Sequence, residues 1–205
     1  STSLTSVRFE NDRLDSIGDS AFAGCARLSF ISFSDMHIGS IGARAFAGCP
    51  LLTSLFIKKP AEIGALGEGC FQNSGLESTG LGQGKGLTSI SADAYEGCQN
   101  LSDTGLGQNQ QIVSVGNWAF ANCPNLHLTG LETNTSVSQL GEGCFFRSNL
   151  DGGLVLPSGS QIEQLPSQAF AGTNMDYAYF RCDHAELIDR DTFRKCWTQE
   201  MVPSG

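Results

Sequence analysis

An aromatic residue recurs eight times along this chain of 205 residues, at steps of 23 to 25 residues. The eight positions are Phe22, Phe46, Phe71, Tyr95, Phe120, Phe145, Phe170 and Phe193. Self-similarity at a period of 20 to 50 residues is typical of a solenoid, in which each repeat buries its apolar face only against its neighbours. The period therefore predicts a single solenoid domain over residues 1–205, with a continuous aromatic spine. It overrides the division into globular domains that length alone would suggest.

Three further positions keep a fixed register to each aromatic residue. An aliphatic residue lies five positions before it, at Ile17, Ile41, Leu66, Ile90, Val115, Leu140, Leu165 and Ile188. Another apolar residue lies three positions earlier still, at Leu14, Ile38, Ile63, Leu87, Ile112, Val137, Ile162 and Ala185. The residue directly before the aromatic is small, as in Ala45 and Cys70. This agreement indicates that equivalent positions of successive rungs lie on top of one another.

A second pattern, L-x-x-Φ-x-Φ with Φ an apolar residue, follows every spine aromatic except Phe193 and begins at residues such as Leu28, Leu52 and Leu101. Its alternation predicts a short strand in every rung, stacked into a parallel sheet with about 4.8 Å between neighbours. The segment around the aromatic has room only for a helical or 3₁₀ turn. The expected fold is therefore α/β in class but dominated by strands, with about eight rungs in a rod roughly 40 Å long.

Two segments carry a family resemblance, residues 17–28 (IGDSAFAGCARL) and residues 41–52 (IGARAFAGCPLL). Both resemble BspA-type leucine-rich repeats in residue type and in spacing, and the resemblance extends over essentially the whole chain. It implies a curved, right-handed solenoid with a concave parallel sheet. It also implies an extracellular or cell-surface protein that takes part in adhesion, with protein or glycan ligands. The chain then reads as part of a longer protein whose export signal and anchor lie elsewhere.

The eight cysteines fit the repeat rather than a disulfide framework. Most lie three residues after the aromatic, at Cys25, Cys49, Cys98, Cys123 and Cys196, and two lie directly before it, at Cys70 and Cys144. Stacked thiols would stand about 4.8 Å apart, beyond the roughly 3.8 Å between Cβ atoms that a disulfide prefers. A zinc site needs paired ligands, and the only cluster, Cys182-Asp183-His184, lacks them. Buried free thiols are expected, without a metal or a cofactor.

Catalysis, nucleic-acid binding and membrane insertion find no support in the sequence. The three histidines, His37, His127 and His184, fall in different rungs, and no G-x-S-x-G motif is present. A net charge of −9 disfavours nucleic acid and anionic membranes as partners. No hydrophobic run approaches the roughly 20 residues of a membrane span. The sequence therefore predicts a protein that is not an enzyme.

The residues that point outward from the predicted strands are the candidate binding residues. One outward row holds Arg8, Ser32, Phe56, Gly80, Gly105, Gly130, Leu154 and Tyr179. The next holds Glu10, Ser34, Lys58, Gly82, Gly107, Glu132, Leu156 and Arg181. The predicted ligand-binding set on the concave face is Arg8, Phe56, Lys58, Gly80, Gly105, Gly130, Leu154, Leu156, Tyr179 and Arg181.

The central glycines in these rows admit two interpretations. In the first, they form a bare trough that accepts an extended peptide or glycan, because strand glycine often marks a close approach of another chain or ligand. Replacing Gly105 by a bulky residue would then abolish binding and leave the fold intact. In the second, the glycines only accommodate sheet curvature or tight loops.

Three roles follow from the sequence. The first is a non-catalytic adhesion or recognition module at the cell surface, which the family resemblance favours. The second is an intracellular scaffold that gathers other proteins on its concave face. The third is a repeat domain that positions an enzyme domain outside this chain. Trp118, at a slot filled elsewhere by residues such as Ser20 and Arg44, is expected on the convex side.

Overall fold

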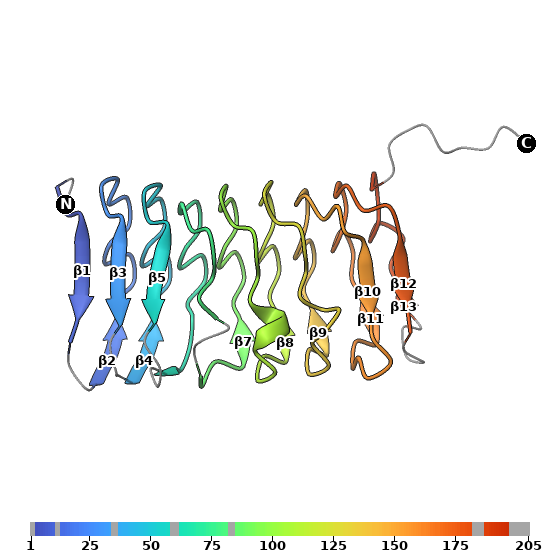
Figure 1. Cartoon of the computed structure of the whole chain (residues 1–205), viewed down its shortest axis with the longest axis horizontal. Helices are drawn as coiled ribbons and strands as arrows, with labels where there is room; N and C mark the ends of the chain where they lie inside the picture. The colour runs from blue at the N-terminus through green and yellow to red at the C-terminus, as the bar shows by residue number, and fades with distance from the viewer. Residues whose placement is uncertain are drawn as a thin grey trace, which may run out of the picture.

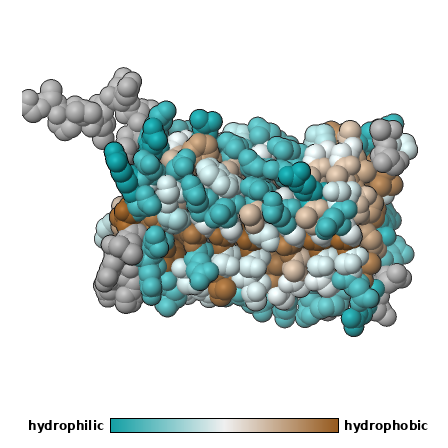
Figure 2. All heavy atoms as spheres, turned by 180° about the vertical axis from the view of Figure 1, so that it is seen from behind, coloured by the Kyte–Doolittle hydropathy of each residue, from teal (hydrophilic) through white to brown (hydrophobic). Residues whose placement is uncertain are grey.

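The computed structural model describes residues 3–10, 13–33, 37–57, 62–81, 85–181 and 187–196. They form a rod of stacked turns, in which the chain passes from one end to the other (Figure 1). Seen from the side opposite to that of Figure 1, hydrophobic side chains form a band along the rod, between hydrophilic zones (Figure 2). The solenoid that the period predicts is confirmed.

Within the described ranges, five short parallel sheets connect neighbouring turns. One row along the rod contains the three-stranded sheet β1 (Ser6–Phe9), β3 (Phe30–Phe33), β5 (Ser54–Ile57) and the two-stranded sheet β10 (Leu154–Leu156), β12 (Ala178–Phe180). Three sheets come from the second segment of each rung, namely β2 (Arg13–Ile17), β4 (His37–Ile41), β6 (Glu62–Ile63); β7 (Ser89–Ile90), β8 (Ser114–Val115), β9 (Gln139–Leu140); and β11 (Gln164–Leu165), β13 (Leu187–Ile188). In the first sheet Val7 pairs with Ile31 and Ile31 with Leu55, so each slot meets the same slot one repeat away.

The aromatic residues form the spine of the core. Ring centroids of successive spine residues lie 5.1 to 5.6 Å apart, with interplanar angles between 0° and 15°. The six central rings are buried, whereas Phe22 and Phe193 at the two ends of the spine are only partly covered. A ring is therefore shielded when it has a neighbouring rung on both sides.

The segment around each aromatic is a tight turn. In the first rung, Ala21, Ala23 and Cys25 donate their N–H groups to carbonyl groups three residues earlier. The aromatic N–H donates to the next rung instead, as from Phe46 to the Cys70 carbonyl at 2.8 Å. The 3₁₀ helix that the structure describes, η1 (Leu106–Gln108), lies in the other half of its rung. The expectation of a helical or 3₁₀ turn at the aromatic is thus replaced by a chain of reverse turns.

Buried cysteines contribute hydrogen bonds to the stack as well as volume. The thiols of Cys98 and Cys123 each lie 3.3 Å from the carbonyl oxygen of the spine aromatic one rung earlier. Ser148, in the same slot as these cysteines, donates its hydroxyl to the Phe120 carbonyl at 2.6 Å. The seven cysteines that the structure describes are buried and free. This position of the repeat therefore favours a hydrogen-bond donor, which explains why Cys, Ser and Thr replace one another there.

Among the described residues of three central rungs, the strand predicted from the L-x-x-Φ-x-Φ pattern is missing. Ser78, Asp103 and Leu128 form only isolated parallel bridges there. Buried threonines hold these rungs together instead, because Thr79 donates its hydroxyl to the Thr104 carbonyl and Thr104 to that of Thr129, both at 2.8 Å. Side-chain hydrogen bonds thus replace part of the sheet ladder.

Tyr95 is the spine position that carries a polar atom, and its buried hydroxyl has no hydrogen-bond partner among the described residues. Burial of an unpaired hydroxyl costs roughly 1 to 3 kcal/mol. We therefore expect Tyr95→Phe to raise the free energy of unfolding by about 1 kcal/mol in urea titrations. Phe120→Tyr, which adds a hydroxyl to the adjacent ring, is the matched control and should lower it. A less stable Tyr95→Phe variant would show that the hydroxyl has a partner.

The buried thiols predict a loss of stability at alkaline pH. Burial raises the pKa of the Cys98 thiol to about 11, and it also raises the pKa values of Cys70, Cys123 and Cys144. The unfolded chain ionises its thiols near the ordinary value of 9.0, so the folded state loses stability as the pH rises above that value. Each such thiol contributes a slope of about 1.4 kcal/mol per pH unit until its folded-state pKa is reached.

Urea titrations under reducing conditions, between about pH 7.5 and about pH 10, measure this slope. Cys144→Ala, at a slot that holds alanine in most other rungs, should retain the fold and show a shallower decline. An unfolding free energy that stays constant over this range would contradict burial of the thiols.

Candidate functional site

The outward side of β1, β3, β5, β10 and β12, together with the bridge residues between them, forms one surface that we call the strand face. At its N-terminal end, Arg8, Glu10, Phe30, Ser32 and Phe56 line an open hollow of about 350 Å³. The Arg8 guanidinium lies 5.9 Å from the centroid of the Phe30 ring, and 51% of Phe56 is exposed. An arginine and two aromatic rings therefore share one accessible surface.

A second group of the same type lies at the other end of the strand face. Tyr177 and Tyr179 point outward around β12 and are 50% and 55% exposed. The Arg181 guanidinium lies 5.2 Å from the centroid of the Tyr179 ring. Five rungs separate Phe56 from Tyr179, which corresponds to about 24 Å at the spacing of a parallel sheet. The strand face thus carries an arginine–aromatic group at each end.

The prediction that Leu154 and Leu156 point outward on the strand face is wrong. Both are fully buried, and the neighbouring Val155 is partly exposed. The register pairs Val155 with Tyr179 and Leu156 with Phe180, one residue away from the alignment expected from the repeat. The sequence around Gly152-Gly153 contains one extra residue before β10, and a shift of one residue exchanges the two sides of a strand. Val155 therefore takes the outward slot that the sequence analysis gave to Leu154.

The central glycines do not form a flat trough. Gly80, Gly105 and Gly130 have left-handed φ values of 71°, 73° and 79°, and Gly105 and Gly130 are buried. A Cβ added at Gly130 would lie 2.7 Å from the Gly107 nitrogen and 2.9 Å from the Thr104 hydroxyl oxygen. These glycines shape tight loops between rungs, as the second interpretation holds. Gly105 shares the left-handed φ and the burial, so we expect a bulky residue there to strain the fold, contrary to the first interpretation.

Of the remaining predicted residues, Arg8, Phe56, Tyr179 and Arg181 lie exposed on the strand face. Lys58 lies outside the described residues, as does the Cys182-Asp183-His184 cluster. The prediction overlooked Phe30 and Tyr177, which occupy the third position of the L-x-x-Φ-x-Φ template. Side chains at this position also point outward, because successive side chains of a strand alternate between its two sides. The sequence pattern could therefore have placed both residues on the strand face.

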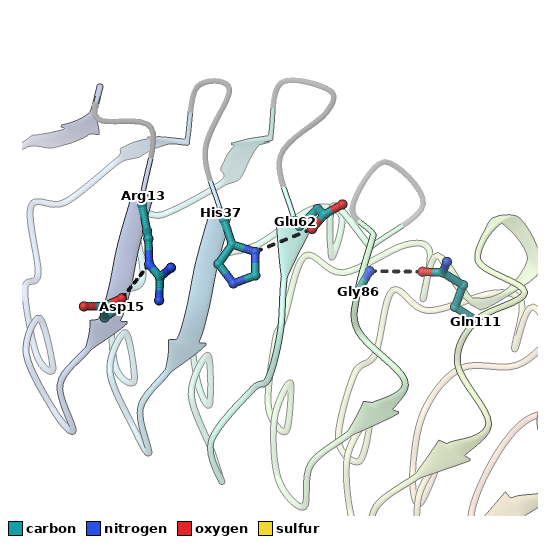
Figure 3. Close-up of polar contacts among 6 residues, drawn as sticks. All are labelled: Arg13, Asp15, His37, Glu62, Gly86 and Gln111. Carbon is teal, nitrogen blue, oxygen red and sulfur yellow. Dashed lines mark hydrogen bonds and ion pairs between the residues drawn. The ribbon is translucent and has the colours of Figure 1, made fainter.

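Polar contacts join neighbouring rungs beside the second set of strands. His37 lies 3.5 Å from the Glu62 carboxylate, Arg13 lies 2.8 Å from Asp15 in its own strand, and Gln111 accepts from the Gly86 N–H at 3.0 Å (Figure 3). The His37 and Glu62 side chains are about half exposed, as are those of a second pair, His127 and Asp151, which joins two other successive rungs. Surface pairs of this type contribute about 0 to 1 kcal/mol to stability.

Neither a metal cluster nor a membrane-spanning helix is found in the part of the chain that the structure describes. Its His, Cys, Asp and Glu residues form no group of three or more that could hold a metal ion. Its helical content includes nothing long and apolar enough to cross a bilayer.

The repeat pattern matches the BspA type leucine rich repeat region, with six copies over residues 1–105 and 65–199. The chain belongs to the BspA-type leucine-rich repeat family. Repeats of this kind suit protein interaction. One similar solved structure is a leucine-rich repeat protein from Bacteroides ovatus ATCC 8483, with 16% sequence identity and a TM-score of 0.37. The similarity covers 94% of this chain and 73% of that one. No curated protein matches the chain in sequence.

The glycine geometry predicts that Gly130→Ala destabilises the fold by about 1 to 3 kcal/mol. The new methyl group would force a left-handed backbone conformation on alanine and would contact Gly107 and Thr104. Gly18→Ala is the matched control, because a Cβ at Gly18 meets nothing within 4 Å and its φ is outside the left-handed region. Thermal unfolding measures both variants, and equal melting temperatures would contradict this role of Gly130.

Proposed function

We propose that this chain is a non-catalytic recognition module of the cell surface that binds a protein ligand along its strand face. The observation that carries the proposal is the pair of exposed arginine–aromatic groups, Arg8–Phe30 with Phe56 at one end and Arg181–Tyr179 with Tyr177 at the other. Their placement on one face of a repeat scaffold favours contact with one extended partner. Membership of the BspA-type family supports a role in adhesion.

The chemistry of the two groups is that of binding hot spots. Tyrosine and arginine are enriched among residues whose truncation weakens protein interfaces most, and large aromatic rings add contact area with little loss of conformational entropy. An arginine over a ring is also held in place before binding, which lowers the entropic cost of forming contacts. Two such groups about 24 Å apart can contact a single polypeptide surface at both ends. A glycan ligand is the second candidate, since aromatic surfaces also accept sugar rings.

The solvent-exposed rings give the proposal a direct test. Binding of the purified chain to immobilised matrix proteins, to glycans and to whole cells identifies a ligand class, and titration then gives a Kd. We expect Phe56→Ala and Tyr179→Ala each to weaken binding at least about tenfold, the size of effect typical of hot spots. The fold should be unchanged, because both side chains point away from the core.

Leu51→Ala is the control variant. Leu51 is 53% exposed, like the two aromatic residues, but it lies in the turn that follows the spine residue Phe46. Its truncation should leave the Kd unchanged. If both aromatic variants bind every ligand as the unmodified chain does, the strand face is not the binding surface.

A further inference from the structure

The turn face gathers positive charge at its C-terminal end. We use this name for the residues one and two positions after each spine aromatic. In the last three rungs that the structure describes, these residues are Phe146 and Arg147, Ala171 and Gly172, and Arg194 and Lys195. By contrast, the sequence between Lys85 and Arg147 contains no lysine or arginine. Three cations therefore lie close together in a chain of net charge −9.

The three side chains surround a hollow above the seventh rung. Its volume is about 200 Å³. Its lining includes Phe146 from the sixth rung, Gln168, Ala171 and Gly172 from the seventh, and Arg194 and Lys195 from the eighth. The Arg147 stem lies across Gly172, since a Cβ added there would be 3.0 Å from the Arg147 Cγ. Arg194 and Lys195 follow on the far side, where the Gly172 N–H donates to the Arg194 carbonyl. The small residues Ala171 and Gly172 leave this space between the longer side chains unfilled.

The three cations have no carboxylate partner among the described residues. No ion pair within 4.0 Å involves Arg147, Arg194 or Lys195. The Glu142 carboxylate accepts a hydrogen bond at 3.3 Å from the amide of Gln168, which lines the hollow. Like charges that converge without a counter-ion repel one another, so a bound anion would relieve this repulsion.

Two of the cations occupy a left-handed backbone position. Arg147 and Lys195 have left-handed φ values of 54° and 61°. The same slot holds glycine or asparagine in all other rungs, at Gly24, Gly48, Asn73, Gly97, Asn122 and Gly172. Glycine and asparagine adopt this conformation readily, whereas a long side chain pays a backbone cost. The Arg147 guanidinium is also held 4.8 Å from the centroid of the Phe146 ring, which orients it at the rim.

We propose that Arg147, Arg194 and Lys195 bind a tetrahedral oxyanion, the sulfate or phosphate group of a small ligand. The planar fork of an arginine matches two oxygen atoms of such a group, and a lysine adds a compact charge. The hollow is large enough for one oxyanion and part of the residue that carries it. This site lies on the turn face and is independent of the function proposed for the strand face.

Titration of the isotope-labelled chain at low ionic strength tests the proposal, with amide shifts of Gly172 and Lys195 as the local readout. The probes are sodium sulfate, sodium phosphate, galactose 6-sulfate and glucose 6-phosphate, and unmodified glucose serves as the neutral comparison. Saturable shifts with the anions and none with glucose are expected. Comparison of free ions with sugar esters then shows which source binds better.

Three single variants, Arg147→Gln, Arg194→Gln and Lys195→Gln, remove one charge each from exposed side chains. Each should weaken anion binding about tenfold, as expected for the loss of a charge-assisted hydrogen bond. Arg27→Gln removes one charge from an exposed residue of the first rung and should change the affinity little. The proposal is overturned if none of the four anions gives saturable shifts. Equal affinity in the Arg147→Gln and Arg27→Gln variants also overturns it.

Discussion

Hydrogen bonding between successive rungs is the constraint on which the rest of this structure depends. Backbone donors of one turn meet acceptors of the next, as from Phe120 to Cys144 at 2.8 Å, so each residue lies above its counterpart one repeat away. The spine rings must then stack at nearly the same distance, and their centroids lie 5.1 to 5.6 Å apart. Every slot therefore needs a side chain that tolerates a near copy of itself on both sides.

Polar residues inside the solenoid satisfy this constraint in a common way. The hydroxyls of Thr79 and Thr104, the thiols of Cys98 and Cys123 and the amide of Asn134 each donate to a carbonyl group of a neighbouring rung. Such a bond removes the desolvation penalty of the buried polar group and adds a link between rungs. Tyr95 departs from this rule, since its hydroxyl lies in the spine, where the neighbouring rungs present aromatic rings.

The period of the sequence was sufficient to predict the stack, the spine and the buried thiols, because these depend on which slots are apolar. It failed where a rung departs from the repeat. An extra residue before β10 moved Leu154 and Leu156 to the inside, and a pattern of apolar residues carries no information on φ at Gly105. The recurring Thr-Gly-Leu triplet at residues 79–81, 104–106 and 129–131 was a usable signal for a turn instead of a strand. For the candidate site, Phe56 and Tyr179 could be placed from the template, whereas Val155 could not.

The difference between inward and outward positions of the repeat also distinguishes the two proposed surfaces. Inward slots are fixed by stacking, but an outward slot contacts mainly its neighbours in the adjacent rungs, so its residue type is free to vary. Arginine and aromatic residues occupy outward slots of the strand face, and Arg147 and Lys195 occupy a slot that favours glycine on the turn face. The exposed aromatic residues cost the solenoid little stability, whereas Arg147 and Lys195 adopt a left-handed backbone conformation that long side chains disfavour. Arg147 and Lys195 are therefore distinguished from the glycine and asparagine of the other rungs by both their charge and their backbone cost.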